Sequence, residues 1–136
     1  MKIWRYVVAA VAAALFPAFA AASAMDECDD AGDRGAVAKC LANLDGEALA
    51  SLKQAETAAG RAARDVEVAT KHPGAYTAFA SSSRAFAVYQ QAQCDYVRAM
   101  QADAGAPTAA EPTVATVARL ACRVDLARER IEILKP

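Results

Sequence analysis

The sequence has only one histidine and no Cys-x-x-Cys pair, which removes two common kinds of catalytic or metal site. The histidine, His72, stands between Lys71 and Pro73, where we expect an exposed turn, and the only nucleophiles close to it in the sequence are Ser81–Ser83. Nucleophilic catalysis also needs a third group that orients the base, and none is indicated here. Zinc sites and thioredoxin-type redox sites commonly use Cys-x-x-Cys spacing. We therefore predict that the protein is not an enzyme and binds neither a metal nor a cofactor.

Three other patterns are absent from the sequence: the polar–apolar alternation of strands, a glycine-rich phosphate loop, and any clustered run of Lys and Arg. The first absence favours an all-α fold, and the last argues against a nucleic-acid partner. Paired carboxylates such as Asp125 and Glu129 could in principle perform acid–base chemistry. They are flanked by Arg123, Arg128 and Arg130, so we interpret them as part of a charged, solvent-exposed helix face.

Residues 1–24 have the three-part layout of a secretory signal peptide. A basic start is followed by the apolar run Tyr6–Phe16, and Ala22-Ser-Ala24 supplies small residues for cleavage after Ala24. The alternative is an uncleaved anchor, because Tyr6–Ala24 carries no charge over 19 residues, close to the ~20 that a membrane span needs. The run is mostly alanine and therefore weakly hydrophobic. We predict cleavage, no stable membrane insertion afterwards, and a single periplasmic or secreted bacterial domain of residues 25–136.

The rest of the chain shows helical periodicity. Between residues 34 and 71 apolar side chains recur every three or four positions, and the pattern stops at His72-Pro-Gly74. Two further helices are predicted, at about Ala75–Gln101 and Thr113–Leu134. One unbroken helix over residues 34–71 would be ~57 Å long and would overhang both of them. We therefore predict a break or kink near Gly46.

The predicted fold is a small antiparallel bundle of three main helices, preceded by a short N-terminal arm or helix and pinned by disulfides. Residues 25–33 are rich in acids, and we expect their backbone to be irregular. Asp33 is placed to cap the first long helix and Thr113 to cap the last. The aromatic side chains at helical spacing in the middle helix should belong to the core; they are Phe79, Phe86 and Tyr89.

The four cysteines form an even set in a chain predicted to be exported, which indicates two disulfides. Cys94 and Cys122 stand at similar distances on either side of the connection between the last two helices. In an antiparallel pair they would lie at nearly the same height, so we predict Cys94–Cys122, together with Cys28–Cys40 at the N-terminal arm. A Cys40–Cys94 pairing is disfavoured if the first long helix is continuous, and a kink at Gly46 would weaken that argument.

Acidic residues crowd the beginning of the predicted mature domain; they are Asp26, Glu27, Asp29, Asp30 and Asp33. The cluster is either a solvated terminus or a negative patch for a cationic partner. The connection 102–112 adds Asp103 and Glu111, and its prolines lower the entropy lost when a loop is ordered on binding. We hypothesise that this end of the bundle, with Asp103 and Glu111, contacts the partner. The alternative is an inert connecting loop.

The second and third predicted helices carry a more specific pattern. Its positions are Arg84, Phe86, Tyr89 and Cys94 in one helix and Cys122, Leu126 and Arg130 in the other. In these residues the chain resembles the LprI-type lysozyme-inhibitor N-terminal-domain family, which consists of small secreted bacterial proteins with paired cysteines. Phe86 stands where the family has Trp, and Ala127 replaces its Thr. The resemblance covers most of residues 25–136.

The resemblance implies a non-enzymatic protein that binds a protein partner, a lysozyme, and inhibits it. One departure bears on this expectation, because the family's Arg-Asp pair is Gln90-Gln91 here. If the pair is structural, amides can replace it through hydrogen bonds at little cost. If it contacts the partner, the target of this chain differs. The alternative function is that of a structural or adaptor protein of the cell envelope, which binds another protein through an exposed helix face.

Overall fold

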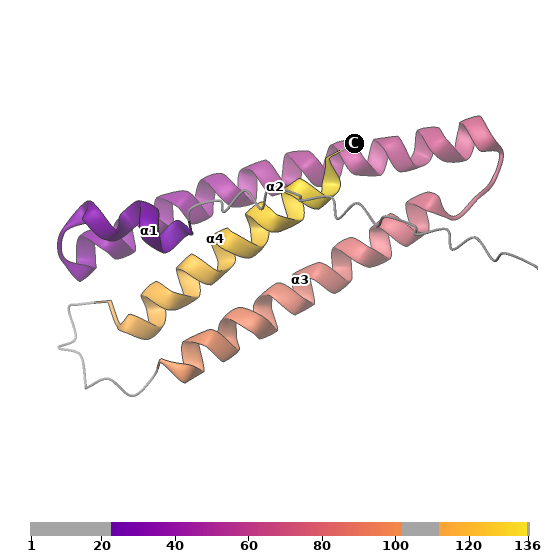
Figure 1. The fold of residues 1–136 in the computed structure, drawn as a ribbon. Helices are drawn as coiled ribbons and strands as arrows, with labels where there is room; N and C mark the ends of the chain where they lie inside the picture. The colour runs from indigo at the N-terminus through magenta and orange to yellow at the C-terminus, as the bar shows by residue number, and fades with distance from the viewer. Residues whose placement is uncertain (1–22, 102–111, 136) are drawn as a thin grey trace, which may run out of the picture.

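Three long helices and a short helical segment at the N-terminus make up the fold (Figure 1). The computed structural model describes residues 23–101 and 112–135. The elements in chain order are α1 (Ala24–Cys28), the 3-10 helix η1 (Asp29–Ala31), α2 (Arg34–Thr70), α3 (Ala75–Met100) and α4 (Val114–Leu134). The described residues contain no strand, and the predicted all-α bundle is confirmed.

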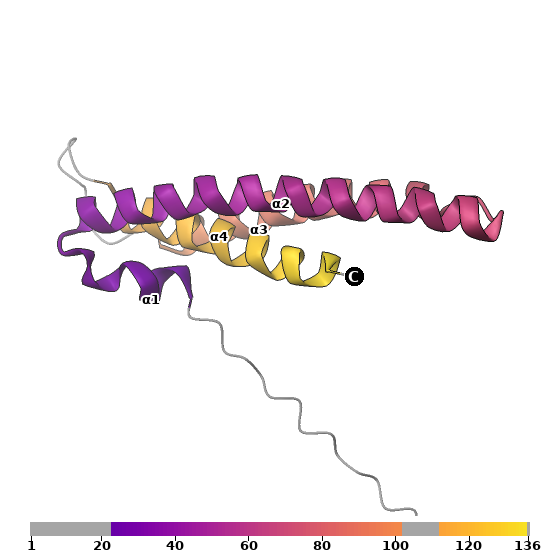
Figure 2. The same cartoon turned by 90° about the horizontal axis from the view of Figure 1, so that it is seen from above.

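The long helices alternate in direction along the chain. α4 lies between α2 and α3, runs in the same direction as α2 and runs opposite to α3 (Figure 1). Seen from above, α1 folds back beside the beginning of α2 and packs against both α2 and α4 (Figure 2). The N-terminal residues expected to be irregular are therefore helical. They form α1 because Ser23 and Asp26 make a capping box and because two long helices hold the segment.

α2 is continuous through Gly46, so the predicted break or kink is wrong. The prediction assumed that the end of so long a helix would have nothing to pack against. Instead, α1 and α4 cover its first part and α3 begins beside its last part, so different partners follow one another along its length (Figure 1). Asp45, which precedes Gly46, also forms an ion pair with Arg123 of α4 at 3.1 Å. One glycine in a helix costs only ~1 kcal/mol relative to alanine, which such packing can offset.

The predicted caps are confirmed at two helix starts. At α2, Asp33 Oδ1 accepts a hydrogen bond from the backbone N–H of Ala36 at 2.8 Å. At α4, Thr113 Oγ1 accepts one from the N–H of Thr116 at 3.0 Å. Each cap satisfies a backbone donor that the helix itself leaves free, which fixes where the helix begins.

A carboxylate organises the turn between α2 and α3. Glu67 Oε1 accepts hydrogen bonds from the backbone N–H groups of Gly74 at 2.8 Å and Tyr76 at 2.9 Å. These bonds hold the pKa of Glu67 below its usual value, because they stabilise the charged form. Lys71 ends α2 in the left-handed conformation with φ 57°. The turn thus reverses the chain and aligns the start of α3 with the end of α2.

The core lies where α1, α2 and α4 meet, and small side chains dominate it. Leu41 of α2, Val124 of α4 and Cys28 of α1 are fully buried. Farther along α2 the predicted apolar face leaves the core, and Val66 is 51% exposed. α4 ends before this part of α2, so the last part of α2 has only α3 as a neighbour (Figure 1).

In that last part, α2 and α3 approach closely at Gly60. A β-carbon on Gly60 would come within 3.0 Å of the ring of Phe79, so the missing side chain makes room for the ring. Phe79 is half-buried as a result. The guanidinium of Arg64 lies 4.1 Å from the centre of the Tyr76 ring, a favourable cation–π contact. These contacts anchor the start of α3 without any contribution from α4.

Candidate functional site

Both predicted disulfides are present. Cys94 of α3 and Cys122 of α4 are joined with their Cα atoms 5.6 Å apart, which agrees with the equal heights expected in an antiparallel pair. Cys28 at the end of α1 is joined to Cys40 of α2 with their Cα atoms 5.8 Å apart. One bond fixes α3 to α4 and the other fixes the N-terminal segment to α2.

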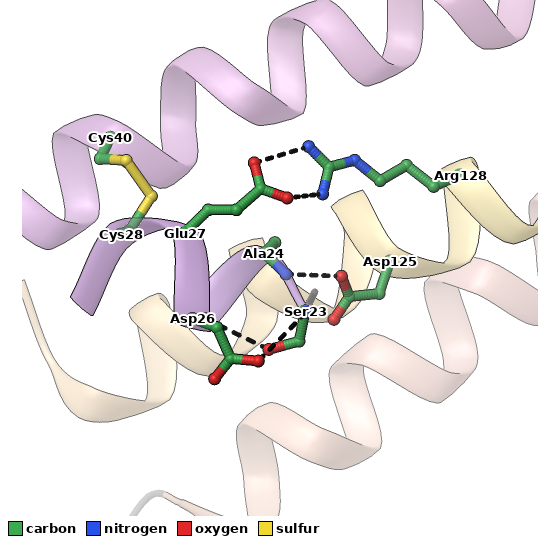
Figure 3. Close-up of polar contacts among 8 residues, drawn as sticks. All are labelled: Ser23, Ala24, Asp26, Glu27, Cys28, Cys40, Asp125 and Arg128. Atoms are coloured by element: carbon green, nitrogen blue, oxygen red, sulfur yellow. Dashed lines mark hydrogen bonds and ion pairs between the residues drawn. A yellow bond between two sulfur atoms is a disulfide. The ribbon is translucent and has the colours of Figure 1, made fainter. Parts of the chain in front are cut away.

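Polar contacts fix α1 to α4 as well (Figure 3). The backbone N–H of Ala24 donates to Asp125 Oδ1 at 2.8 Å, and the guanidinium of Arg128 donates to both carboxylate oxygens of Glu27. The pKa of Glu27 is lowered, chiefly by the hydrogen bond from Arg128, which favours the charged form.

These contacts correct the interpretation of α4 as carrying a purely solvent-exposed charged face. Asp125 and Arg128 instead bind α1, and Arg123 binds Asp45 of α2. No local pattern indicates these contacts, because Asp125 and Arg128 each lie 101 residues from their partners.

One end of the bundle is acidic. We call the exposed aspartates of α1, of η1 and of the N-cap of α2 the acidic end; they are Asp26, Asp29, Asp30 and Asp33. Asp26 and Asp33 also accept hydrogen bonds as helix caps, and Arg34 follows with an opposite charge. Asp103 and Glu111, which the sequence predicted to contact the partner from the same end, lie outside the described residues.

The structure brings together two residues of the family-like pattern, Phe86 and Arg130. The guanidinium of Arg130 lies 5.4 Å from the centre of the Phe86 ring, and Nη2 donates to Ser82 Oγ at 2.9 Å. Arg130 is only 9% exposed. This contact between α3 and α4 is structural in character, because the arginine is enclosed by the two helices.

The other pattern residues do not join that contact. Arg84 is exposed and donates to Ser81 Oγ at 3.2 Å, while Leu126 is half-buried. Tyr89 is 53% exposed, so its predicted place in the core is wrong. α3 is covered by its neighbours along one side only, and Tyr89 lies on the other side.

Gln90 and Gln91 line a small hollow between α3 and α4. Its volume is about 250 Å³, below the roughly 300–1,000 Å³ of typical ligand pockets. Gln90 Nε2 donates to the backbone carbonyl of Arg123 at 3.0 Å and so ties α3 to α4. The remaining lining residues are Ala87, Cys94, Arg119 and Arg123. Gln90 therefore has a structural contact, whereas Gln91 borders the open hollow.

Two of the three serines that follow His72 in the sequence accept hydrogen bonds from arginines, and the buried hydroxyl of Ser83 has no hydrogen-bond partner among the described residues. Ser81 accepts from Arg84 and Ser82 accepts from Arg130, while His72 is exposed in the turn between α2 and α3. In residues 23–101 and 112–135, no group of three His, Cys, Asp or Glu side chains is arranged to hold a metal ion. No helix in the same ranges is long and apolar enough to cross a membrane.

The comparison with protein families gives one match. The family described as Lysozyme inhibitor LprI matches residues 24–134, from the first residue of α1 to the last residue of α4. No curated protein and no solved structure matches the chain.

Proposed function

The chain belongs to the LprI family of lysozyme inhibitors, and on that basis we propose that it is an exported, non-enzymatic protein that binds and inhibits a lysozyme. The observation that carries the proposal is the extent of the family match. Residues 24–134 include every helix from α1 to α4 and all the cysteines of both disulfides. The match therefore covers the folded unit as a whole and not only a shared fragment.

The rigid framework around the acidic end supports a binding role. The Cys28–Cys40 bond fixes this end to α2, and the Glu27–Arg128 pair fixes it to α4. A surface that is already ordered loses less conformational entropy when a partner binds. The aspartates on α1 and η1 therefore meet a partner in fixed relative positions.

The charge of the acidic end suits a cationic partner. Many lysozymes are cationic, and complementary charge speeds the encounter of two proteins more than it strengthens the final complex. Asp29 and Asp30 are the best candidates for direct contact, because both are exposed on η1. Glu27 is already paired with Arg128, and Asp33 caps α2.

Charge reversal at the acidic end tests this surface. The variant Asp30→Lys should slow association with a cationic lysozyme several-fold at low salt, and the difference should shrink as salt screens the charges. The matched control is Asp65→Lys, because Asp65 is another exposed aspartate and lies near the end of α2 that is remote from η1. Equal effects of both variants would mean that net charge alone matters. Unchanged association of Asp30→Lys would remove the acidic end from the contact surface.

A second candidate function, that of an adaptor in the cell envelope, is favoured by the outer side of α3. Large apolar side chains are exposed there at helical spacing; they are Val88, Tyr89, Tyr96 and Met100. Apolar groups gathered on a surface often mark a protein contact. Replacing Tyr89 and Tyr96 with Ser separates the alternatives. If lysozyme inhibition is lost in this variant and kept in Asp30→Lys, α3 is the inhibitory surface; if the unaltered protein does not inhibit, the adaptor function gains support.

A further inference from the structure

The first described residues, Ser23 and Ala24, are built into the fold (Figure 3). Ala24 is fully buried, and its N–H donates to Asp125 Oδ1 at 2.8 Å. Ser23 is the N-cap of α1: its Oγ accepts from the N–H of Asp26 at 3.2 Å, and its own N–H donates to Asp26 Oδ2 at 3.2 Å. Both residues therefore act as part of the domain, and the family match also includes Ala24.

This arrangement bears on where the predicted signal peptide is removed. Cleavage by a signal peptidase needs small residues at the first and third positions before the cut. Small residues occupy both positions before four bonds of this stretch, those that follow Ala20, Ala22, Ser23 and Ala24. A cut after Ser23 would remove the residue that caps α1. A cut after Ala24, as predicted from the sequence, would remove Ser23, which caps α1, and Ala24, whose N–H donates to Asp125.

We propose that signal peptidase hydrolyses the bond between Ala22 and Ser23, so that the mature chain begins with Ser23. Water adds across this peptide bond, leaving a carboxylate on Ala22 of the released leader and an α-ammonium group on Ser23. The Ser23 nitrogen already lies 3.2 Å from Asp26 Oδ2. The cut therefore turns a neutral donor into a charged one and makes that hydrogen bond a charge-assisted ion pair.

The same geometry distinguishes this bond from its neighbours. A cut after Ala20 would keep the cap, but it would place the new charge two residues before the nitrogen that contacts Asp26. A cut after Ala24 would require the peptidase to reach a bond next to a buried residue once α1 has packed. Only the cut before Ser23 keeps every contact of α1 and adds one charge at a carboxylate.

Intact mass and N-terminal sequencing of the exported protein test the proposal directly. The full chain, with its leader, is produced in a bacterium that exports it, and the protein is recovered from the envelope or the medium. The expected product is residues 23–136. A product that begins at Ala21, Ala24 or Met25, or one that retains the leader, would overturn the proposal. The result does not depend on whether the protein inhibits a lysozyme.

A pair of leader variants checks the assigned bond. Ala20→Leu places a large side chain at the third position before the proposed cut, while Ala22-Ser-Ala24 stays intact for a cut after Ala24. Product beginning at Ser23 should fall at least tenfold. The control Ala21→Leu changes the second position, where size is less restricted, and should leave the product unchanged. Normal yield of the Ser23 product from Ala20→Leu would contradict the assignment.

Two purified chains measure what the retained residues contribute. The chain that begins at Met25 lacks the cap and the Ala24 donor, so its folded-to-unfolded equilibrium constant should be about tenfold lower than that of the chain that begins at Ser23. Equal stability of the two chains would remove the structural reason for the proposed cut.

Discussion

Glu27 and Arg128 face each other across α1 and α4, although 101 residues separate them, and both oxygens of the carboxylate accept N–H groups of the guanidinium. The two side chains remain 37% and 36% exposed. Together with the Cys28–Cys40 bond and the hydrogen bond from Ala24 to Asp125, the pair gives α1 three separate attachments. The position of α1 therefore depends on two polar contacts and one covalent bond.

The Glu27–Arg128 pair should contribute modestly to stability. In a double-mutant cycle with Glu27→Gln and Arg128→Met, we expect a coupling energy of about 0.5–1 kcal/mol, because solvent screens a pair that is one-third exposed. Urea unfolding of the four proteins measures it. The control is the more exposed pair of Glu132 and Lys135, for which coupling should be near zero. No coupling between Glu27 and Arg128 would mean that the pair does not hold α1.

Acid should destabilise the fold through Glu27 and Glu67. Arg128 lowers the pKa of Glu27, and backbone N–H groups of Tyr76 and Gly74 lower that of Glu67. The unfolded chain takes up these protons near the ordinary glutamate pKa of ~4.3, and the folded chain does so only at lower pH. The stabilisation is therefore complete above that value and is lost as pH falls through the folded pKa values.

Thermal unfolding from pH 7 to pH 3 measures this dependence. The melting temperature should fall below about pH 5, and Glu67→Gln should lower it at pH 7 while making the fall on acidification shallower. An identical pH profile for Glu67→Gln and the unaltered protein would show that the turn carboxylate does not contribute.

Two glycines of α2 should respond differently to alanine. Nothing lies within 4 Å of a β-carbon added at Gly46, so Gly46→Ala should stabilise the continuous helix by up to ~1 kcal/mol. At Gly60 the added β-carbon meets the ring of Phe79 at 3.0 Å, and the same gain is offset by displacement of the ring. Chemical denaturation compares the two. A loss of stability in Gly46→Ala would indicate that the helix bends there in solution.

Removing the disulfides one at a time should give unequal losses. The Cys94–Cys122 bond closes the longer loop, with a sequence separation of 28 against 12 for Cys28–Cys40. In the chain-entropy account the longer loop contributes roughly 3–4 kcal/mol and the shorter ~3. Paired Cys→Ala variants, unfolded in urea, test the order. A larger loss from the Cys28–Cys40 pair would show that α1 contributes more through its contacts than through loop closure.

Local signals were enough to predict the three long helices and the caps of α2 and α4. Proline and glycine after His72 end α2, and the side chains of Asp33 and Thr113 accept the N–H groups of the next turn. The Cys94–Cys122 disulfide was also predictable, because equal heights in an antiparallel pair follow from rise per residue alone, and Cys28–Cys40 is the pairing that remains. These features depend on residues near one another in the sequence or on simple helix geometry.

Features that depend on distant partners could not be predicted. Continuity through Gly46 depends on how α1, α4 and α3 share the length of α2, and the exposure of Tyr89 depends on which side of α3 is covered. The attachment of Ala24 to Asp125 joins residues 101 positions apart. Periodicity describes one helix at a time and carries no information about which helix lies beside it.

Inhibition of a lysozyme by the folded domain can be measured directly in a turbidity titration. Lysis of a cell-wall suspension is followed with a panel of lysozymes, including a strongly cationic one, while the oxidised, exported protein is added in increasing amounts. We predict that the lysis rate of at least one lysozyme falls with dose and saturates, and that protein with both disulfides reduced and alkylated loses this effect. An unchanged lysis rate for every lysozyme at large molar excess, with circular dichroism showing an intact helical fold, would contradict the proposed function.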